Sequence, residues 1–343
     1  MRAQRDDGFI GHTIFWGEQV SRERARRYNV VERADHTTAT IQPPLLAWSW
    51  EIVAQRSGEK RAAFVAEGLE TLERHYDWLA RERALGDSDL LTLIQPDESG
   101  LDASPKFDSV WGPRCCGLPG FLLLVRRNRR HSFDARRIAA AHPREHVREV
   151  LTNVLYMKGL CALVRIGGDA RFAHRAERAQ AELVERCYEP RTGLFFDLAG
   201  DDDHHLRTNT WSALAPLALD GLPDEIVRRL VEEQLLDPQR YATPVPIASV
   251  SADEQSFNPG ADERRLLFVH LRRYWRGPSW VNTAWLLVPA LRRLGYQAEA
   301  DRLLAPLLDA MEREGLREYY NARTGEGLGA RDFGWSALAL ELL

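Results

Sequence analysis

The stretch VREVLTNVLYMKGLCALV (residues 147–164) is apolar on nearly every face of a helix, and FAHRAERAQAELVERC (172–187) follows it closely. The second stretch carries one apolar stripe, formed by Phe172, Ala176, Ala179, Leu183 and Cys187. A helix that is apolar all round is buried, whereas a helix with one apolar stripe covers a core from outside. The pair therefore predicts a buried inner helix followed by an outer helix.

The same alternation recurs along the chain. Single stripes also occur at 59–82, 226–231 and 296–311, and further segments that are apolar on nearly every face occur at 44–54, 211–219, 279–294 and 333–343. Alternating strand patterns are few. Buried helices need an outer layer to cover them, so the pattern predicts an all-α fold, an (α/α) toroid of helical hairpins.

The helix count predicts a ring with an open side. Five inner and four outer helices are fewer than six hairpins require, so we expect one domain over 1–343 whose N-terminal helices are missing, unless 9–28 supplies part of them. Trp48 and Trp50 should then lie near exposed apolar surface. A second copy could close the gap, which predicts a possible homo-oligomer.

Composition limits the partners and the compartment. The net charge is −4, from 46 basic and 50 acidic residues, which argues against nucleic acid and membrane surfaces as partners. The apolar runs are far shorter than a membrane span, and MRAQRDDG (1–8) shows no hydrophobic signal region. The four cysteines suggest reduced thiols rather than a disulfide framework. We therefore expect a cytoplasmic protein.

Long non-helical stretches are predicted at 83–113, 188–206 and 237–278, each between an outer and an inner helix. They should gather on one face of the ring, and loops of that length are usually functional. Three clusters mix acids, aromatic rings and glycines: QPDESGLDASP (95–105), YWRGPSWVNTAW (274–285) and EYYNARTGEGLG (318–329), which leads into DFGW. Rings stack on pyranose faces and polar groups bind sugar hydroxyls, so the clusters indicate a carbohydrate site.

Four segments carry a family resemblance. They are ESGLDASPKFD (98–108), YWRGPSWVNTAW (274–285), EYYNARTGEGLGARDFGWSA (318–337) and TIQPPLLAW (40–48). In this order they resemble the signature regions of glycoside hydrolase family 63 and the related trehalases, most closely the bacterial mannosylglycerate and glucosylglycerate hydrolase type. One departure is that the aromatic-Trp-Asp motif of these relatives is absent from this sequence.

The resemblance implies an (α/α)6 toroid and an inverting α-glycosidase that needs no metal or other cofactor. By position in the motifs, it implies Asp102 as general acid and Glu318 as general base. It further implies a group of substrate-binding residues, namely Glu98, Trp275, Arg276, Gly277, Trp280, Asn282, Tyr320 and Trp335. The expected substrate is a small α-glucoside or α-mannoside, such as glucosylglycerate, mannosylglycerate or a trehalose-like sugar.

Taken alone, the residues leave structural alternatives open. Asp102 could cap a turn, and Glu318 could be a solvated charge at the end of the outer helix. Trp275 and Trp280 could belong to the core, and Arg276 could only pair with a carboxylate. Asp97, Glu98 and Asp108 suit backbone orientation or hydroxyl binding better than proton transfer.

Two sequence motifs are discounted. HPREH (142–146) fits a zinc pattern, but Pro143 suggests the first residue of a helix in an exposed stretch. The run RRNRR (126–130) lacks interleaved aromatic residues and predicts a solvated face.

The inverting mechanism sets a geometric expectation. The carboxyls of Asp102 and Glu318 should lie about 6.5 to 9.5 Å apart, leaving room for a water, and donors such as Arg276 should keep the base ionised. Two alternatives remain: a carbohydrate-binding or inactive truncated family member, and a sugar epimerase or isomerase on the same fold. An epimerase or isomerase would need paired histidines, and no histidine lies in the three clusters.

Overall fold

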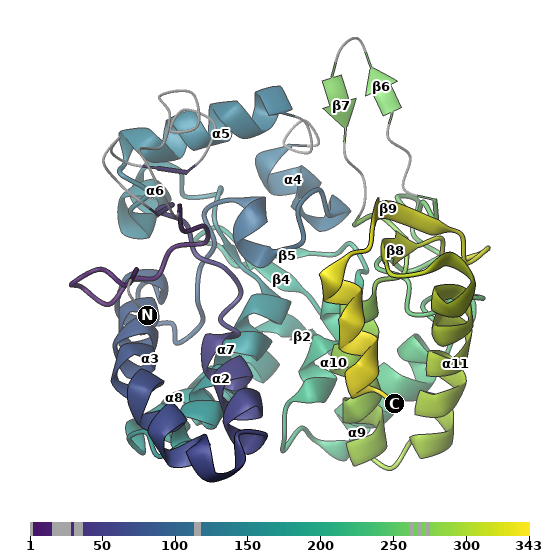
Figure 1. Cartoon of the computed structure of the whole chain (residues 1–343). Coiled ribbons are helices and arrows are strands. Elements are labelled where there is room, and N and C mark those ends of the chain that lie inside the picture. The colour runs from purple at the N-terminus through teal and green to yellow at the C-terminus, as the bar shows by residue number, and fades with distance from the viewer. Residues whose placement is uncertain are drawn as a thin grey trace. The chain divides into compact units, whose positions relative to one another are not determined.

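Helices make up most of the computed structural model, which describes residues 3–15, 29–30, 37–112, 118–260, 264–266, 269–271 and 275–343 (Figure 1). Residue contacts divide the chain into two compact units. The first comprises Met1–Leu101, Pro119–Cys187 and Asp197–His205, and the second comprises Asp102–Leu118, Tyr188–Phe196 and Leu206–Leu343. The single domain expected over 1–343 stays a prediction.

The first unit is built mainly from α-helices: α2 (Leu46–Gln55), α3 (Arg61–Arg83), α5 (Leu118–Arg130), α6 (Ala135–Ala141), α7 (Val150–Arg165) and α8 (Arg171–Cys187). Short 3-10 helices occur at η1 (Gly58–Lys60) and η2 (Pro96–Ser99). A small sheet has the order β1-β4-β5, with β1 (Val147–Arg148), β4 (Asp197–Ala199) and β5 (His204–Leu206). In it, Val147 pairs antiparallel with Ala199.

The second unit combines helices with short antiparallel strand pairs. Its helical elements are η3 (Pro105–Phe107), α4 (Asp108–Trp111), η5 (Trp211–Ala218), α9 (Asp224–Arg228), the π-helical η6 (Arg229–Leu235), α10 (Val281–Arg293), α11 (Gln297–Glu314) and η7 (Gly334–Glu341). Its strands are β2 (Tyr188–Glu189), β3 (Leu194–Phe195), β6 (Arg264–Leu266), β7 (Val269–Leu271), β8 (Arg317–Tyr320) and β9 (Gly327–Arg331). They pair as β2-β3, β6-β7 and β8-β9.

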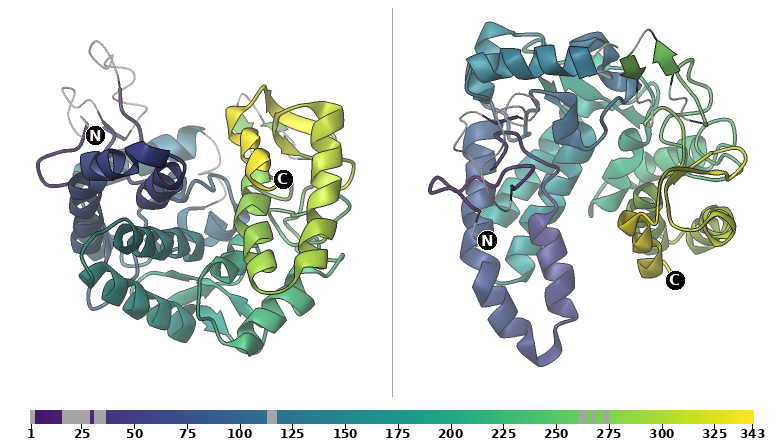
Figure 2. Two further views of the ribbon diagram at one scale, coloured as in Figure 1. Left: turned by 60° about the horizontal axis from the view of Figure 1, so that its bottom comes forward. Right: turned by 45° about the horizontal axis from the view of Figure 1, so that its top comes forward.

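The inner and outer helices predicted at 147–187 are confirmed. Nearly every residue of α7 is buried, whereas α8 buries only the predicted stripe. The two helices pack against each other (Figure 2). Their loop needs the two glycines Gly167 and Gly168, the first of which has φ 101°. The amphipathic pattern thus located this hairpin correctly, including the face that each helix buries.

Tyr76 on α3 and Gly159 on α7 fix the contact between these two helices. The Tyr76 ring is fully buried, stacks on Tyr156 with centroids 5.9 Å apart, and its hydroxyl donates to the Pro44 carbonyl oxygen at 2.5 Å. A Cβ placed on Gly159 would lie 2.0 Å from the Tyr76 hydroxyl oxygen. The close approach of α3 and α7 therefore requires glycine at this position.

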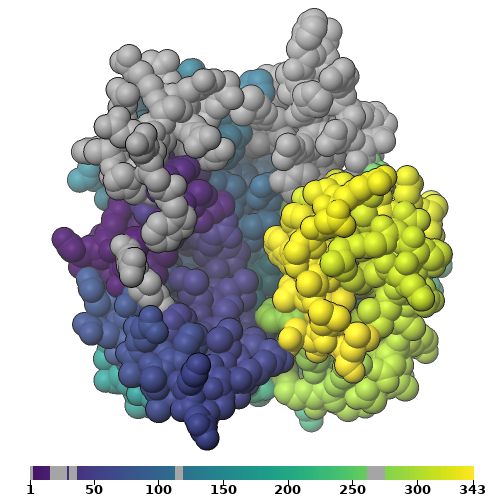
Figure 3. All heavy atoms as spheres, in the orientation of Figure 1, coloured from purple at the N-terminus to yellow at the C-terminus, as the bar shows by residue number. Residues whose placement is uncertain are grey.

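Two helices predicted to be buried all round are not. In α2 only Ala47, Glu51 and Ala54 are buried, while Leu46 and Val53 are largely exposed. In η7 only Ser336 and Ala339 are buried, and Figure 3 shows this C-terminal segment at the surface. An apolar face is buried only where another element packs on it, and the sequence of one helix does not show its neighbours.

Two helices were not predicted from the sequence, and one predicted helix start is wrong. Helices α5 and α6 lie in a region where no helix was predicted. The basic run 126–130 belongs to α5. Arg126 and Arg130 are exposed, as predicted for a solvated face, whereas Asn128 is fully buried. Pro143 does not begin a helix, because α6 ends at Ala141 and Pro143 lies in the turn that follows.

Three further observations concern the predicted loops and ends. The stretch 188–206 forms strands β2 to β5, so it is not irregular throughout. Much of 9–28, together with Cys115, Cys116 and Tyr274, lies outside the described residues. Among the helices that the structure describes, none has the length and apolarity needed to cross a membrane.

Replacing Gly159 by Ala tests the α3–α7 contact. The added methyl group would overlap the Tyr76 hydroxyl, so we expect a loss of about 1 to 3 kcal/mol in the free energy of unfolding, measured by urea denaturation. Gly334→Ala is the matched control, since a Cβ at Gly334 meets nothing within 4 Å. Equal stability of the two variants would contradict the packing described.

Candidate active site

Two of the signature segments are joined by backbone pairing within the second unit. Ser279, just before α10, and Tyr320, the last residue of β8, exchange both hydrogen bonds: Ser279 N–H to Tyr320 O at 2.8 Å and Tyr320 N–H to Ser279 O at 2.9 Å. Both residues are fully buried. Segment 274–285 is thereby fixed against segment 318–329, although the two are separate in sequence.

An aromatic cluster surrounds this junction. The rings of Trp275 and Trp280 stack with centroids 4.0 Å apart and planes 7° apart, and Trp211 lies 6.3 Å from Trp275. On the other side, Trp280 lies 4.7 Å from Tyr319 and 6.3 Å from Trp335. The cluster therefore runs from the interior of the unit towards its surface.

Exposure separates the members of the cluster. Trp275 and Trp280 are 2% and 3% exposed, as the core alternative predicted, whereas Trp335 is 43% exposed. A sugar ring can stack only on an aromatic face that is open to solvent. Of the three tryptophans predicted to bind substrate, Trp335 is thus the one whose ring is open to a ligand. Trp280 packs against Trp335, and Trp275 packs against Trp280.

The predicted general base lies on a strand, not at the end of a helix. Helix α11 ends at Glu314, and Glu318 is a half-buried residue of β8. Its Oε2 accepts a hydrogen bond from the Ala330 N–H on β9 at 3.0 Å. A Cβ on Gly329 would come within 2.5 Å of the same oxygen, and Gly329 has φ 68°. The GEGLG sequence therefore leaves room for the Glu318 carboxylate.

The predicted general acid lies in a tight turn. Asp102 is half-buried and follows η2, whose C-cap Gly100 has φ 69°. The next residue, Ala103, has φ 63°, a left-handed conformation that is unfavourable for a residue with a Cβ. Such strained residues concentrate at functional sites. Asp102 and Glu318 belong to the same compact unit.

Arg276 pairs with Asp108. Its Nη2 lies 2.6 Å from Oδ1 and 2.8 Å from Oδ2 of that carboxylate, and Arg276 is 8% exposed. This is the ion pair that the structural alternative predicted, and an effect of Arg276 on the ionisation of Glu318 stays a prediction. Gly277, with φ 151°, approaches Asn258 so closely that a Cβ would lie 2.5 Å from the Asn258 carbonyl oxygen.

Two predicted substrate-binding residues are wholly occupied by the protein. Tyr320 is fully buried, and its hydroxyl donates to Gly315 O at 2.6 Å and accepts from Arg317 N–H at 3.0 Å. Burial raises the pKa of this phenol. The Tyr320 side chain closes the turn between α11 and β8, and its role in substrate binding stays a prediction.

Glu98 is also internal, within the first unit. It is fully buried, and Arg83 contacts both of its oxygens, at 2.6 and 2.8 Å. The backbone N–H groups of Ile41 and Ile94 donate to the same carboxylate at 3.0 and 2.9 Å. No face remains for a sugar hydroxyl. Glu98 orients the backbone, as the structural alternative predicted, and its role as a substrate ligand stays a prediction.

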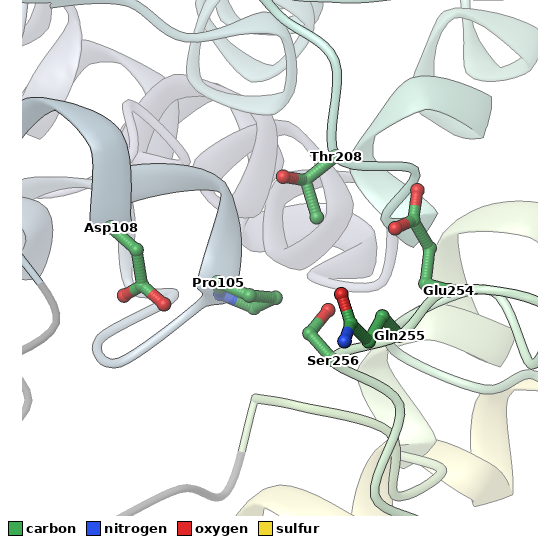
Figure 4. A pocket seen from close by; sticks show the side chains of 6 residues that line it. All are labelled: Pro105, Asp108, Thr208, Glu254, Gln255 and Ser256. Atoms are coloured by element: carbon green, nitrogen blue, oxygen red, sulfur yellow. The ribbon is translucent and has the colours of Figure 1, made fainter.

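The second unit has an open cavity of about 470 Å³. Figure 4 shows the residues that line it, which are Pro105, Asp108, Thr208, Glu254, Gln255 and Ser256. Sequence reasoning named Asp108 and the loop 237–278 but not Thr208, Glu254, Gln255 or Ser256. Membership of the long loop 237–278 is the only signal for Glu254, Gln255 and Ser256, and Thr208 lies outside all three predicted loops. Isolated polar residues in a loop carry no spacing pattern.

Asn282 remains compatible with its predicted role. It is half-buried on the first turn of α10, and its Oδ1 has no hydrogen-bond partner within the described part of the chain. A buried carbonyl oxygen of this kind can accept a hydrogen bond from a ligand hydroxyl.

Among the residues that the structure describes, no group of three or more His, Cys, Asp or Glu side chains could hold a metal ion.

A family model described as "Mannosylglycerate hydrolase MGH1-like glycoside hydrolase domain" matches residues 1–336. The chain belongs to this family. The match confirms the resemblance seen in the motifs, and the protein is a glycoside hydrolase. The motifs 98–108, 274–285 and 318–329 all lie within the matched range.

Named relatives agree with this assignment. A mannosylglycerate hydrolase from Rubrobacter radiotolerans is 29% identical over 342 residues, covering 89% of this chain and 74% of the relative. A glucosylglycerate hydrolase from Mycolicibacterium hassiacum is 27% identical, covering 99% of this chain and 84% of the relative.

Solved structures confirm the fold class. The GH63 mannosylglycerate hydrolase from Thermus thermophilus in complex with glucose matches with a TM-score of 0.82 and 25% identity, covering 99% of this chain and 84% of that one. The neutral trehalase Nth1 from Saccharomyces cerevisiae has a TM-score of 0.58 at 17% identity, and this likeness shows the fold alone. Both support the predicted all-α fold of the (α/α)6 type.

Replacing Glu98 by Gln tests its assignment as a structural residue of this family member. The change leaves the Arg83 charge buried without its partner, so we expect a loss of about 3 to 5 kcal/mol in unfolding free energy. Glu82→Gln is the control, because the Arg81–Glu82 pair is exposed and should be worth less than about 1 kcal/mol. Chemical denaturation of both variants measures the difference; a Glu98→Gln protein of unchanged stability would refute the assignment.

Proposed function

We propose that this protein is an inverting α-glycosidase that hydrolyses a small α-glucoside or α-mannoside. The observation that carries the proposal is the family match over 1–336, with a carboxylate at each of the two signature positions, Asp102 and Glu318. The relatives are named for hydrolysis of mannosylglycerate and glucosylglycerate, which supports a short glycoside as substrate.

In the proposed mechanism Asp102 protonates the glycosidic oxygen as the bond to the aglycone breaks. Glu318 removes a proton from a water that attacks the anomeric carbon from the opposite face. The Ala330 N–H holds the Glu318 carboxylate by one oxygen, which fixes its direction and leaves the other oxygen to act on water. Trp335 offers the aromatic surface on which the sugar would stack.

The buried residues beside Glu318 restrain its position, which the proposed reaction requires. The Ser279–Tyr320 hydrogen bonds place Trp280 beside Tyr319, the residue that follows Glu318. A catalytic carboxylate must be held close to its productive geometry, and rigid packing behind it supplies that restraint.

We also propose a cytoplasmic location, which the buried Cys187 supports because it is a free thiol.

Asp102→Asn should keep the fold and lower kcat by at least about 10²-fold, the usual scale for losing a positioned proton donor. The assay is release of reducing sugar from α-mannosyl- and α-glucosylglycerate, with circular dichroism to check the fold. Asp309→Asn, the same change at an exposed position on α11, should leave kcat unchanged. If Asp102→Asn turns over as fast as the parent, Asp102 is not the acid.

The stereochemistry of the first product tests the pairing of Asp102 with Glu318. An inverting enzyme releases the β-anomer from an α-glycoside, because water attacks from the face opposite the leaving group. Proton NMR recorded within the first minutes, before mutarotation, should show the β-anomer first. Early appearance of the α-anomer would mean retention and a nucleophilic role for Glu318.

A further inference from the structure

The segment 102–111, which carries the proposed acid, has little regular structure of its own. It forms only the short 3-10 helix η3 and the single turn α4, and Ala103 is left-handed with φ 63°. Helices this short leave most of their backbone N–H and C=O groups without an intrahelical partner, so side-chain contacts must hold the segment in place. One such contact is the ion pair between Asp108 and Arg276, which belong to the same compact unit.

Arg276 projects from a backbone that is fixed on both sides. The Asn258 N–H donates to the Arg276 carbonyl oxygen at 2.7 Å, and the Gly277 N–H donates to Ser249 Oγ at 2.9 Å. Gly277 also lies too close to Asn258 to carry a Cβ. A backbone packed this closely cannot shift without losing these hydrogen bonds. Arg276 is therefore the fixed member of the ion pair, and Asp108 is the residue that it holds.

The geometry of the pair restricts Asp108 closely. A single nitrogen, Arg276 Nη2, lies 2.6 Å from Oδ1 and 2.8 Å from Oδ2 of Asp108. Hydrogen bonds between two charged groups are among the strongest in proteins. The Arg276 side chain is 9% exposed, so salt screens the pair little and the arginine would be costly to leave without its carboxylate.

Arg276 is also linked to the proposed base by a short path. Three residues after Arg276 comes Ser279, which exchanges two backbone hydrogen bonds with Tyr320. Glu318 precedes Tyr320 by two residues on the same strand, β8. The arginine that holds Asp108 is therefore part of the same rigid framework as the base.

We propose that the Arg276–Asp108 ion pair positions the acid relative to the base, and that both residues act through Asp102 and not through a contact with the sugar. Asp108 follows Asp102 by six residues, so fixing Asp108 limits the positions that the acid can take. An inverting enzyme needs a set separation of its two carboxyls, because a water must fit on the side of the base. The inference rests on the proposed glycosidase function and adds two positioning residues to it.

A double-mutant cycle tests the pair. Asp108→Ala and Arg276→Gln each remove the contact, so each should lower kcat for the hydrolysed glycerate glycoside by at least about ten-fold, because small misplacements of a catalytic group are costly. The KM should stay within about two-fold of the parent value. The double variant should be no slower than about two-fold below the slower single variant, since both changes break one interaction.

Three outcomes of the cycle would overturn the proposal. The first is an unchanged kcat in either single variant. The second is a double variant whose loss is the product of the two single losses, which would mean that the residues act independently. The third is a raised KM with an unchanged kcat, which would indicate a direct contact with the substrate.

The matched control is Asp301→Ala. Asp301 on α11 accepts from Arg292 Nη2 on α10 at 2.8 Å, so this is a second Asp–Arg pair in the same unit. Both side chains are more exposed than those of the proposed pair, and both residues lie outside the signature segments. The control should keep the kcat of the parent.

The variants should fold, because a second contact holds the same segment. Lys106 Nζ donates to Ser212 Oγ at 2.9 Å, and none of the substitutions removes this bond. Circular dichroism checks the fold. If Asp108→Ala is unfolded, Asp108→Asn replaces it in the cycle: the amide keeps the shape and one acceptor but loses the charge, and kcat should fall by at least about three-fold. An unchanged kcat in that variant would overturn the proposal.

The leaving group distinguishes a misplaced acid from general damage to the site. α-Glycosyl fluorides need little protonation as their bond breaks, so they depend less on the acid than a glycerate glycoside does. The loss of kcat in Asp108→Ala should be at least about five-fold smaller for the fluoride of the same sugar, as it should be for Asp102→Asn. Equal losses on both substrates would show that the pair does not act through the acid.

Hydrogen exchange separates this proposal from the proposed function. In Asp108→Ala, the most protected amides of 103–111 should exchange at least about ten-fold faster than in the parent, and Asp301→Ala should leave them unchanged. If the parent hydrolyses no glycoside but this difference is seen, the glycosidase function fails and the ion pair stands as the restraint on the segment. Unchanged exchange in 103–111 refutes the restraint, whatever the activity.

Discussion

The pair of backbone hydrogen bonds between Ser279 and Tyr320 is the constraint on which the candidate site depends. It joins the start of α10 to strand β8, so that Trp280 and Glu318 are carried by elements fixed to each other. Both residues are fully buried, and a buried backbone pair is costly to break because its N–H and C=O groups would lose their partners. The Trp275–Trp280 stack and the β8–β9 hairpin are then built on either side of this junction.

Charge is arranged differently in the two carboxylate clusters. Glu98 and Arg83 form a fully buried ion pair in which both oxygens of the Glu98 carboxylate accept two hydrogen bonds each. This arrangement suits a residue that holds the backbone. Asp108 and Glu254 face an open cavity, and only Asp108 has an arginine partner among the described residues. The same chemical group is therefore enclosed by the protein in one place and lines an open cavity in the other.

The family match and the cavity concern different segments of the chain. The match over 1–336 includes the motifs that the proposed mechanism uses for the acid, the base and the aromatic surface. Most of the side chains that line the cavity come from outside those motifs.

The sequence by itself determined the helical fold class, the α7–α8 hairpin with its buried stripe, and the segments that hold Asp102, Glu318 and Trp335. These follow from periodicity and motif order, which are local properties of the chain. Tertiary structure alone decided that α2 and η7 are partly exposed, that Tyr320 and Glu98 are internal, and that Arg276 pairs with Asp108. Burial and pairing depend on which distant segments pack together, and a residue's type and spacing do not encode its neighbours.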